Sequence, residues 1–101
     1  HCQPLKKGTA PLPETRIAEL LHSFPGWELQ QGAISKVFAF PDYHRTLAFV
    51  NAVAYIAHQQ DHHPELNVLY DRCRVSFNTH SIGGISENDF ICAARIESLF
   101  V

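Results

Sequence analysis

The order of apolar and polar positions along the chain predicts its helices and strands. From Glu14 onward, apolar residues recur at the i, i+3, i+4, i+7 spacing of an amphipathic helix. Those positions are Ile17, Leu20, Leu21 and Phe24. Pro25-Gly26 ends this helix. Residues 27–30 and 34–40 then alternate between apolar and polar, which predicts two strands joined as a hairpin by Gln31-Gly32.

The longest helix is expected from Pro41-Asp42 to about Asp61. One stripe of its apolar residues comprises Tyr43, Leu47, Val50 and Ala54. A second stripe widens the apolar face and comprises Phe49, Val53 and Ile56. The combined face is broad enough to lie across a sheet. Pro64 disfavours helical geometry for His63, so the helix should break there and present His62 and His63 at its C-terminal end.

A second pair of strands and a final helix follow. Residues 66–70 and 73–79 are the strand candidates, joined by Asp71-Arg72. Side chains alternate between the two faces of a strand. One face of the later strand therefore carries Cys73, Val75, Phe77 and Thr79, and the other carries Arg74, Ser76, Asn78 and His80. Ser86 and Asp89 have capping-box spacing, with Ile85 and Phe90 placed as a hydrophobic staple. The last helix has the apolar stripe Cys92, Ile96 and Leu99.

These elements predict an α+β fold. A four-stranded antiparallel sheet carries three helices on one face, in the order α-β-β-α-β-β-α. The chain of 101 residues has the size of one domain. We expect residues 1–12 to form an extended lead-in without a part in chemistry, and residues 13–101 to form the domain. The polar face of the last strand is either solvated or lines a site.

Composition excludes several classes of function. Lys and Arg total 8 against 10 Asp and Glu, a net charge of −2, so the basic excess that direct nucleic-acid binding requires is absent. The longest apolar-rich run, residues 46–57, is shorter than the roughly 20 residues of a membrane span. We expect no membrane association and a cytoplasmic location. The three cysteines include no C-x-x-C pair, which excludes a zinc ribbon. Cys73 and Cys92 are expected to be small buried apolar side chains.

Histidine is the unusual component, with seven residues in the chain. The grouping of His58, His62, His63 and His80 allows several interpretations. Helix C-termini favour histidine, and a strand end accepts a polar residue, without any catalytic role. The i, i+4 pair His58 and His62 has zinc-helix spacing, with His80 as a third ligand. Gln59 stands where a metalloprotease helix has Glu, however, and we predict no metal.

Metal-free acid/base catalysis is the remaining interpretation. Imidazole exchanges protons near neutral pH, which suits it to both roles. A dehydration needs one group that protonates the departing hydroxyl and another that takes a proton from the neighbouring atom. A cluster of imidazoles in different environments fits that requirement.

Three segments carry a more specific pattern: Asp61-His62-His63-Pro64-Glu65, Thr79-His80 and Gly84-Ile85-Ser86-Glu87-x-Asp89. Together they resemble the pterin-4a-carbinolamine dehydratases. Further similar positions are Trp27, Phe40-x-Asp42-Tyr43-x-Arg45 and Ala48-Phe49, so the resemblance covers about residue 12 to the C-terminus. It implies the α+β fold described above, no metal or organic cofactor, and dehydration of 4a-hydroxytetrahydropterin to quinonoid dihydropterin. That substrate forms when an aromatic amino-acid hydroxylase uses its pterin.

The resemblance also implies roles for individual residues. His62, His63 and His80 would be the catalytic imidazoles, with Asp89 as a further catalytic residue. Asp61, Asn78, Thr79 and Ser81 would line the pterin pocket. His58 stands where many family members have Glu, and is therefore placed among the substrate-binding residues. Our hypothesis is that His80 or His63 acts as general acid on the hydroxyl while His62 handles the N5 proton.

The resemblance implies partners as well. It predicts a homodimer or homotetramer and a functional coupling to an aromatic amino-acid hydroxylase. An alternative function is a non-catalytic dimerisation and coactivator module of the same fold, because animal members also bind a homeodomain transcription factor. The retained histidines favour the enzyme.

Overall fold

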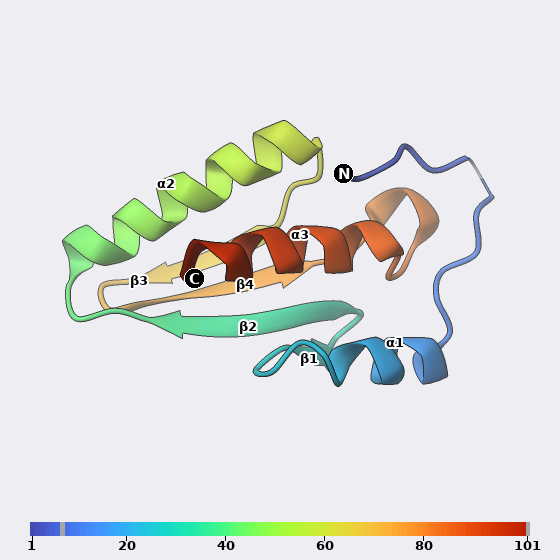
Figure 1. Ribbon diagram of the computed structural model, residues 1–101, viewed down its shortest axis with the longest axis horizontal. Helices are drawn as coiled ribbons and strands as arrows, with labels where there is room; N and C mark the ends of the chain where they lie inside the picture. The colour runs from blue at the N-terminus through green and yellow to red at the C-terminus, as the bar shows by residue number, and fades with distance from the viewer. Residues whose placement is uncertain (7, 101) are drawn as a thin grey trace.

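The computed structural model describes residues 1–6 and 8–100, and it confirms the predicted α+β fold (Figure 1). Four antiparallel strands form one sheet in the order β1-β2-β4-β3. The strands are β1 (Glu28–Gln30), β2 (Ala33–Ala39), β3 (Glu65–Leu69) and β4 (Arg72–Phe77). The helices are α1 (Glu14–Leu21), α2 (Tyr43–Gln60) and α3 (Glu87–Glu97), with short 3₁₀ turns η1 (His80–Ile82) and η2 (Ser98–Phe100). α2 and α3 cover the same face of the sheet, and α1 lies near β1 at one end.

Both hairpins form where the sequence places them. Gln31 and Gly32 each have positive φ, 50° and 77°, as the two central residues of a type I′ turn require. That turn matches the strand twist and pairs Gln30 with Ala33. In the second hairpin Leu69 pairs with Arg72, so the turn is Tyr70-Asp71, one residue earlier than predicted.

Helix α2 ends at Gln60 in a Schellman motif, within one residue of the predicted end at about Asp61. Asp61 adopts the left-handed conformation (φ 50°, ψ 43°), and the His62 N–H donates to the Ala57 carbonyl at 3.2 Å. The chain therefore leaves the helix at Asp61. This turn sets the direction in which His62 and His63 depart.

The second apolar stripe of α2 faces the sheet. Phe49, Val53 and Ile56 are buried, whereas the Tyr43 side of the helix is exposed. In the first stripe Leu47 and Ala54 are exposed, whereas Val50 is half-buried against the core. Leu99, predicted to continue the stripe of α3, is also exposed, because the α-helix ends at Glu97 and η2 changes the periodicity.

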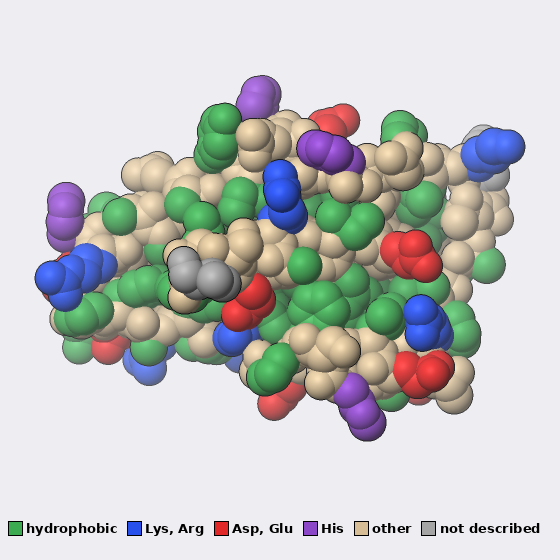
Figure 2. Space-filling view, viewed as in Figure 1, with side chains coloured by type: hydrophobic (Ala, Val, Ile, Leu, Met, Phe, Trp, Pro, Cys, Tyr) green, Lys and Arg blue, Asp and Glu red, His purple; other side chains and the backbone are tan. Residues whose placement is uncertain are grey.

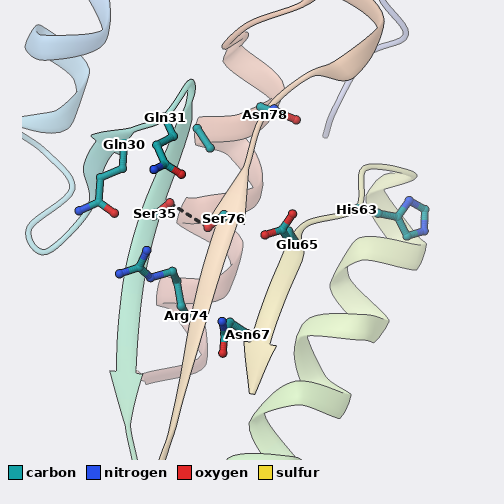
Figure 3. A pocket seen from close by; sticks show the side chains of 10 residues that line it. Gln30, Gln31, Ser35, His63, Glu65, Asn67, Arg74, Ser76 and Asn78 are labelled. Carbon is teal, nitrogen blue, oxygen red and sulfur yellow. Dashed lines mark hydrogen bonds between the residues drawn. The ribbon is translucent and has the colours of Figure 1, made fainter. Parts of the chain in front are cut away.

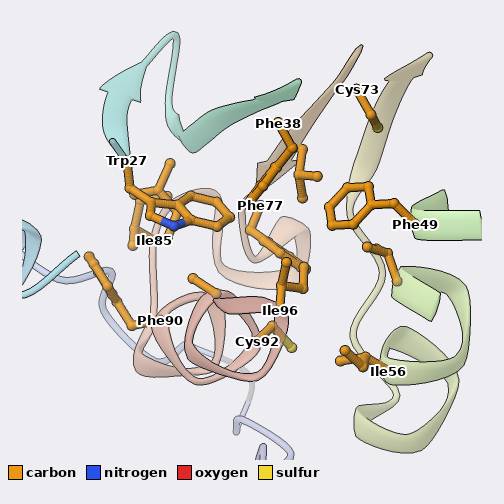
Figure 4. Close-up of a cluster of buried hydrophobic side chains, with 14 of the residues drawn as sticks. Trp27, Phe38, Phe49, Ile56, Cys73, Phe77, Ile85, Phe90, Cys92 and Ile96 are labelled. Carbon is orange, nitrogen blue, oxygen red and sulfur yellow. The ribbon is translucent and has the colours of Figure 1, made fainter. Parts of the chain in front are cut away.

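The core lies between the sheet and the helices (Figure 4). Alternation along β4 is confirmed, since Cys73, Val75 and Phe77 are buried on its helix side. Trp27 lies against Phe38 and Phe77, and its indole N–H donates to the Glu97 carboxylate at 2.9 Å. Buried polar groups require such partners.

On the helical side, hydrophobic side chains gather between α1 and α3 (Figure 2). There Leu20, Phe24, Phe90, Ile91 and Ala94 line a shallow groove with Glu87. In the part of the chain that the structure describes, no helix has the length and apolarity to cross a membrane.

The predicted lead-in, residues 1–12, packs onto the domain. Cys2 and Leu12 lie against the core, and the Leu12 N–H donates to the Ile85 carbonyl at 2.8 Å. The division at residue 12 stays a prediction. Lys7 and Val101, the latter the end of the predicted domain, lie outside the described residues.

Candidate active site

Two cavities contain predicted site residues, and they lie on opposite faces of the sheet. The helix-side cavity, about 330 Å³, lies between the end of α2, η1 and the start of α3. It is lined by Asp61, His62, Thr79 and Ser81, together with Gln59, Gln60, Asn88 and the N-terminal segment, residues 2–5. The open-face cavity, about 270 Å³, lies over the uncovered face of the sheet and is lined by His63 and Asn78 among other polar residues.

His62 is the imidazole held most firmly. Its ring stacks on Phe77 with the planes 8° apart and the centroids 5.9 Å apart. Its Nε2 lies 2.6 Å from Oδ1 of Asp89, and its side chain is 13% exposed. Packing on one side and a short hydrogen bond on the other fix the ring in one orientation at the cavity wall.

Asp89 is fully buried and uses both carboxylate oxygens. Oδ1 contacts His62, and Oδ2 accepts hydrogen bonds from the Ser86 backbone N–H and the Thr79 hydroxyl, both at 2.9 Å. The bond from Ser86 completes the predicted capping box of α3. The sequence predicts Asp89 both as a capping residue and as a site residue. The two oxygens allow it to cap α3 and to hold His62 at the same time.

A chain of hydrogen bonds supports this pair. The Thr79 hydroxyl proton is directed to Asp89, so the Ser86 hydroxyl, 2.7 Å away, donates to the Thr79 oxygen. The Thr79 hydroxyl is thus committed to holding Asp89. Its side chain positions the acidic group instead of presenting a free hydroxyl to the cavity.

The network determines which ring nitrogen of His62 is available for chemistry. An ionised carboxylate only accepts hydrogen bonds, so Nε2 carries a proton and donates it to Asp89. Nδ1 is then the ring nitrogen that Asp89 does not engage. In this arrangement a carboxylate holds an imidazole in one tautomer and one orientation.

The N-terminal segment forms a wall that sequence reasoning did not find. The Cys2 N–H donates to Gln60 Oε1 at 2.9 Å. Asn88 binds the backbone of Gln3 twice, accepting from its N–H at 3.0 Å and donating to its carbonyl at 2.8 Å. These contacts join residues more than 55 positions apart. No pattern of neighbouring residues in the sequence predicts them.

Gln60 is a further residue that the prediction missed. Phe49, Val53, Ile56 and Gln60 are spaced by four, three and four, so Gln60 continues the buried stripe of α2. That spacing was the available signal. The side chain is buried, and its Nε2 has no hydrogen-bond partner among the described residues. Gln60 belongs to the lining of the helix-side cavity.

The other predicted site residues do not line the helix-side cavity. His63 is exposed and, with Asn78, lines the open-face cavity (Figure 3). His80 and His58 are exposed and line neither cavity. His80 stands between Thr79 and Ser81 in the chain, and both of these neighbours line the helix-side cavity. Adjacent residues leading into a strand point to opposite sides, which separates His62 from His63.

The open-face cavity is polar, but its groups are loosely held. Ser35 and Ser76 pair across β2 and β4 with their hydroxyl oxygens 2.8 Å apart. Glu65, Asn67 and Arg74 surround them on the same face (Figure 3). Within residues 1–6 and 8–100, no group of three or more His, Cys, Asp or Glu residues is arranged to hold a metal ion.

Comparison with known proteins decides the family. Residues 10–99 match the family described as Pterin 4 alpha carbinolamine dehydratase. The chain belongs to this family. The predicted resemblance is confirmed, and the match spans nearly the whole domain, including both loops of the helix-side cavity.

Relatives within the pterin 4 alpha carbinolamine dehydratase family are similar over almost the full chain. A protein of Xanthomonas campestris is 58% identical over 99% of this chain and 86% of its own length. A protein of Xylella fastidiosa is 56% identical over 99% of this chain and 88% of its own. Both carry the name pterin-4-alpha-carbinolamine dehydratase, which confirms the predicted enzyme class, a hydro-lyase.

Solved structures share the fold of this dehydratase family member. A Brucella melitensis protein described as a transcriptional coactivator/pterin dehydratase has a TM-score of 0.83 and 32% identity, over 88% of this chain and 97% of its own. A pterin dehydratase-like protein described as a RuBisCO assembly factor in the alpha-carboxysome has a TM-score of 0.60 and 24% identity, over 72% of this chain and 84% of its own. The second likeness concerns the fold alone.

Proposed function

We propose that this protein dehydrates 4a-hydroxytetrahydropterin to quinonoid dihydropterin in the helix-side cavity. The observation that carries the proposal is the 2.6 Å contact between His62 and the fully buried Asp89 at the wall of that cavity. Membership of the dehydratase family supports the substrate class. The contact supplies what such a substrate requires, a proton-exchanging group with a fixed orientation.

The reaction removes one water molecule. A general acid protonates the hydroxyl at C4a, the C4a–O bond breaks, and the N5 lone pair forms the C4a=N5 bond. N5 then loses its proton to a general base. The acid gives one proton and the base takes one, so the enzyme regains its protonation state after a proton passes between them or through water.

His62 is suited to the role of base. Asp89 holds Nε2–H, which leaves Nδ1 to accept the N5 proton, and the carboxylate stabilises the imidazolium that forms. We assign the general acid to His80, whose chain neighbours Thr79 and Ser81 both line this cavity. His63, the alternative acid, lines the open-face cavity and could serve only a substrate that reaches that side of the sheet. A positioned proton transfer typically contributes about 10² to 10⁴ in rate.

The remaining predicted residues are proposed to bind the pterin. Asp61 and Ser81 line the same cavity as His62. Asn78 and His58 lie outside that lining and would contact the substrate only at its periphery. Gln60 is added to the binding residues, because its buried Nε2 is a donor suited to a pterin carbonyl or ring nitrogen.

The test follows the absorbance of the 4a-carbinolamine while an aromatic amino-acid hydroxylase turns over. Wild-type protein should accelerate its decay. His62→Ala and His80→Ala should each lose rate, and His63→Ala, whose side chain lines the open-face cavity, should lose less. His44→Ala, which removes an exposed histidine near the start of α2, should keep the full rate. Full rate in all three site variants would overturn the assignment of histidine catalysis, and no acceleration by the wild type would overturn the proposed activity.

The physiological setting is proposed on the same basis. The protein would recycle a tetrahydrobiopterin-type cofactor for a hydroxylase, and it would act as a homodimer or homotetramer. The exposed apolar residues Tyr43, Leu47 and Tyr55 on α2 suit self-association. Light scattering tests this directly, and a strict monomer at micromolar concentration would contradict it.

A coactivator function is the second candidate, because the Brucella melitensis relative is described with both functions. This function would use the same exposed face of α2 for a partner helix. A variant such as Tyr55→Glu would then lose partner binding and retain dehydration activity. His62→Ala would lose dehydration activity and retain partner binding.

A further inference from the structure

We propose that Cys2 and Cys92 form an oxidisable dithiol, in which a peroxide converts the two thiols into a disulfide that fixes the N-terminal segment against the helix-side cavity. The disulfide itself is independent of the function proposed above. Its effect on catalysis rests on that function. No cysteine spacing in the sequence indicates this pair, because the two residues are 90 positions apart.

The two sulfur atoms are already in contact. Cys2 Sγ lies 3.5 Å from Cys92 Sγ and 3.5 Å from the carbonyl oxygen of Asn88. A disulfide bond is about 2.05 Å long, so the sulfurs need to approach by about 1.5 Å. Rotation of the half-buried Cys2 side chain can supply that movement. Cys92 on α3 is fully buried and can remain in place.

Hydrogen bonds on both sides of Cys2 hold it in this position. Its N–H is bound to Gln60, and the next residue, Gln3, is bound through its N–H and carbonyl to Asn88. Asn88 is itself buried and lies in the first turn of α3, four residues before Cys92. The segment is therefore aligned with the helix that carries the second thiol. Such alignment raises the effective concentration of one thiol at the other.

The chemistry begins at Cys2, because Cys92 has no exposed surface. The Cys2 thiolate attacks a peroxide oxygen, an S–O bond forms, the O–O bond breaks, and water leaves after protonation. Cys92 then attacks the sulfur of the resulting sulfenic acid, the S–S bond forms, and a second water leaves. Overall, two thiols lose two protons and two electrons, and one peroxide is reduced to two waters.

The second step depends on proximity. Burial, reinforced by the hydrogen bond with Cys2, raises the pKa of the Cys92 thiol, so little thiolate is present at neutral pH. Asp89 acts in the same direction and Arg95 opposes it. The contact distance compensates for the scarce thiolate, because the attacking sulfur needs no diffusion. Cys73 is also buried, but its sulfur contacts the carbonyl oxygen of Arg74 instead of another cysteine.

The disulfide would change the cavity, because residues 2–5 form one wall of it and His62 lies in the same lining. In the reduced protein the wall is held by noncovalent contacts, among them the hydrogen bonds of Cys2 and Gln3, and can move away to admit a substrate. In the oxidised protein a covalent bond between residues 2 and 92 prevents that movement. We therefore expect oxidation to lower kcat/KM severalfold.

The first experiment measures the bond and needs no activity. The full chain is treated with stoichiometric hydrogen peroxide, blocked with iodoacetamide, digested without reductant and analysed by mass spectrometry. A peptide pair joining Cys2 and Cys92 is expected in the wild type and in the control Cys73→Ser, and it should disappear after dithiothreitol. Cys2→Ser retains the buried helix cysteine and should yield no linked peptide.

Other products overturn the proposal. Sulfinic or sulfonic acid on Cys2 without a linked pair would show that Cys92 does not reach it, and a disulfide between two chains would show that the contact is not used. Circular dichroism of Cys2→Ser separates a lost bond from a lost fold.

The second experiment measures activity on the same oxidised sample. The reduced protein is assayed first, so absence of any dehydration exposes failure of the proposed function and leaves the disulfide result intact. With active protein, oxidation should lower kcat/KM, and dithiothreitol should restore it. Cys2→Ser should be insensitive to peroxide. An unchanged kcat/KM in fully oxidised protein would overturn the link between the disulfide and the cavity.

Discussion

The two cavities on the two faces of the sheet differ in how their polar groups are held. In the helix-side cavity, the His62 ring is fixed by Phe77 on one side and a buried carboxylate on the other. In the open-face cavity, polar groups are as numerous, yet only the hydroxyl pair of Ser35 and Ser76 is bonded within the lining. The comparison teaches that polarity alone does not mark an acid/base site. The proposed site is distinguished instead by a buried network that fixes the orientation of one imidazole.

The largest expected effect comes from breaking the fixed pair. His62→Ala should lower kcat by about 10² to 10⁴, because it removes a positioned proton transfer. Asp89→Asn should lower kcat by a similar factor, since an amide cannot hold the imidazole in the same way. Because the two residues act as a unit, the double variant should lose little more than the worse single variant. Steady-state kinetics measure all three.

The matched control lies on the other face. Arg74→Ala changes the lining of the open-face cavity and should alter kcat by less than about threefold, well under the cost of one catalytic proton transfer. A loss comparable to that of His62→Ala would place the chemistry on the open face and reverse the comparison.

The next effect is on stability and compares neighbouring residues of β4. Phe77 faces the core and stacks on His62, and Phe77→Ala should cost about 3–5 kcal/mol of unfolding free energy. Ser76→Ala, one position away on the open face, should change it by about 0.5 kcal/mol. Urea titration followed by circular dichroism measures both. Equal costs would contradict the assignment of the two faces.

A smaller effect is expected at Asp61, which combines a left-handed backbone with a predicted role in binding. Asp61→Asn keeps a residue that tolerates this conformation and removes the charge, so stability should hold while KM rises. Asp61→Val places a β-branched residue there and should cost about 1–2 kcal/mol of stability. If Asp61→Asn leaves KM unchanged, Asp61 serves only the turn.

The smallest effect is at alkaline pH. Burial raises the pKa of Cys73 and Cys92 above the ordinary value of 9.0. A thiol whose pKa is higher in the folded state contributes stability that is fully present below pH 9 and is lost as the pH rises beyond it. The unfolding free energy of the wild type should therefore fall above pH 9. That of Cys92→Ala should fall less steeply over the same pH range. A parallel pH dependence in the two proteins would exclude Cys92 as the cause.

Local signals in the sequence predicted most of the fold. The Gln31-Gly32 turn, the Ser86 capping box and the alternation along β4 each depend on neighbouring residues, and all are confirmed. The stripe of α2 that faces the core was not determined by the sequence, because both stripes are apolar and tertiary packing selects one. The prediction that Leu99 continues the apolar stripe of α3 was wrong for a related reason, since the helix ends two residues before it.

The candidate site was predicted less completely. Asp61, His62, Thr79 and Ser81 share a cavity, because two loops that end neighbouring elements meet there. The N-terminal wall depends on contacts of Gln3 with Asn88, 85 residues away, which no local pattern contains. The separation of His63 from His62 follows from backbone direction after Asp61, and the left-handed turn that sets this direction is formed by a residue other than glycine.

The link between α2 and β3 has a consequence for evolution by insertion and deletion. Only residues 61–64 separate Gln60 from Glu65, and within this link His62 and His63 line cavities on opposite faces of the sheet. Removing or adding one residue would exchange the sides to which the two imidazoles point, as a register slip does in a strand. Selection would then act on whether the number of residues in this link is even or odd. Among natural variants, length changes are expected in the lead-in far more often than here.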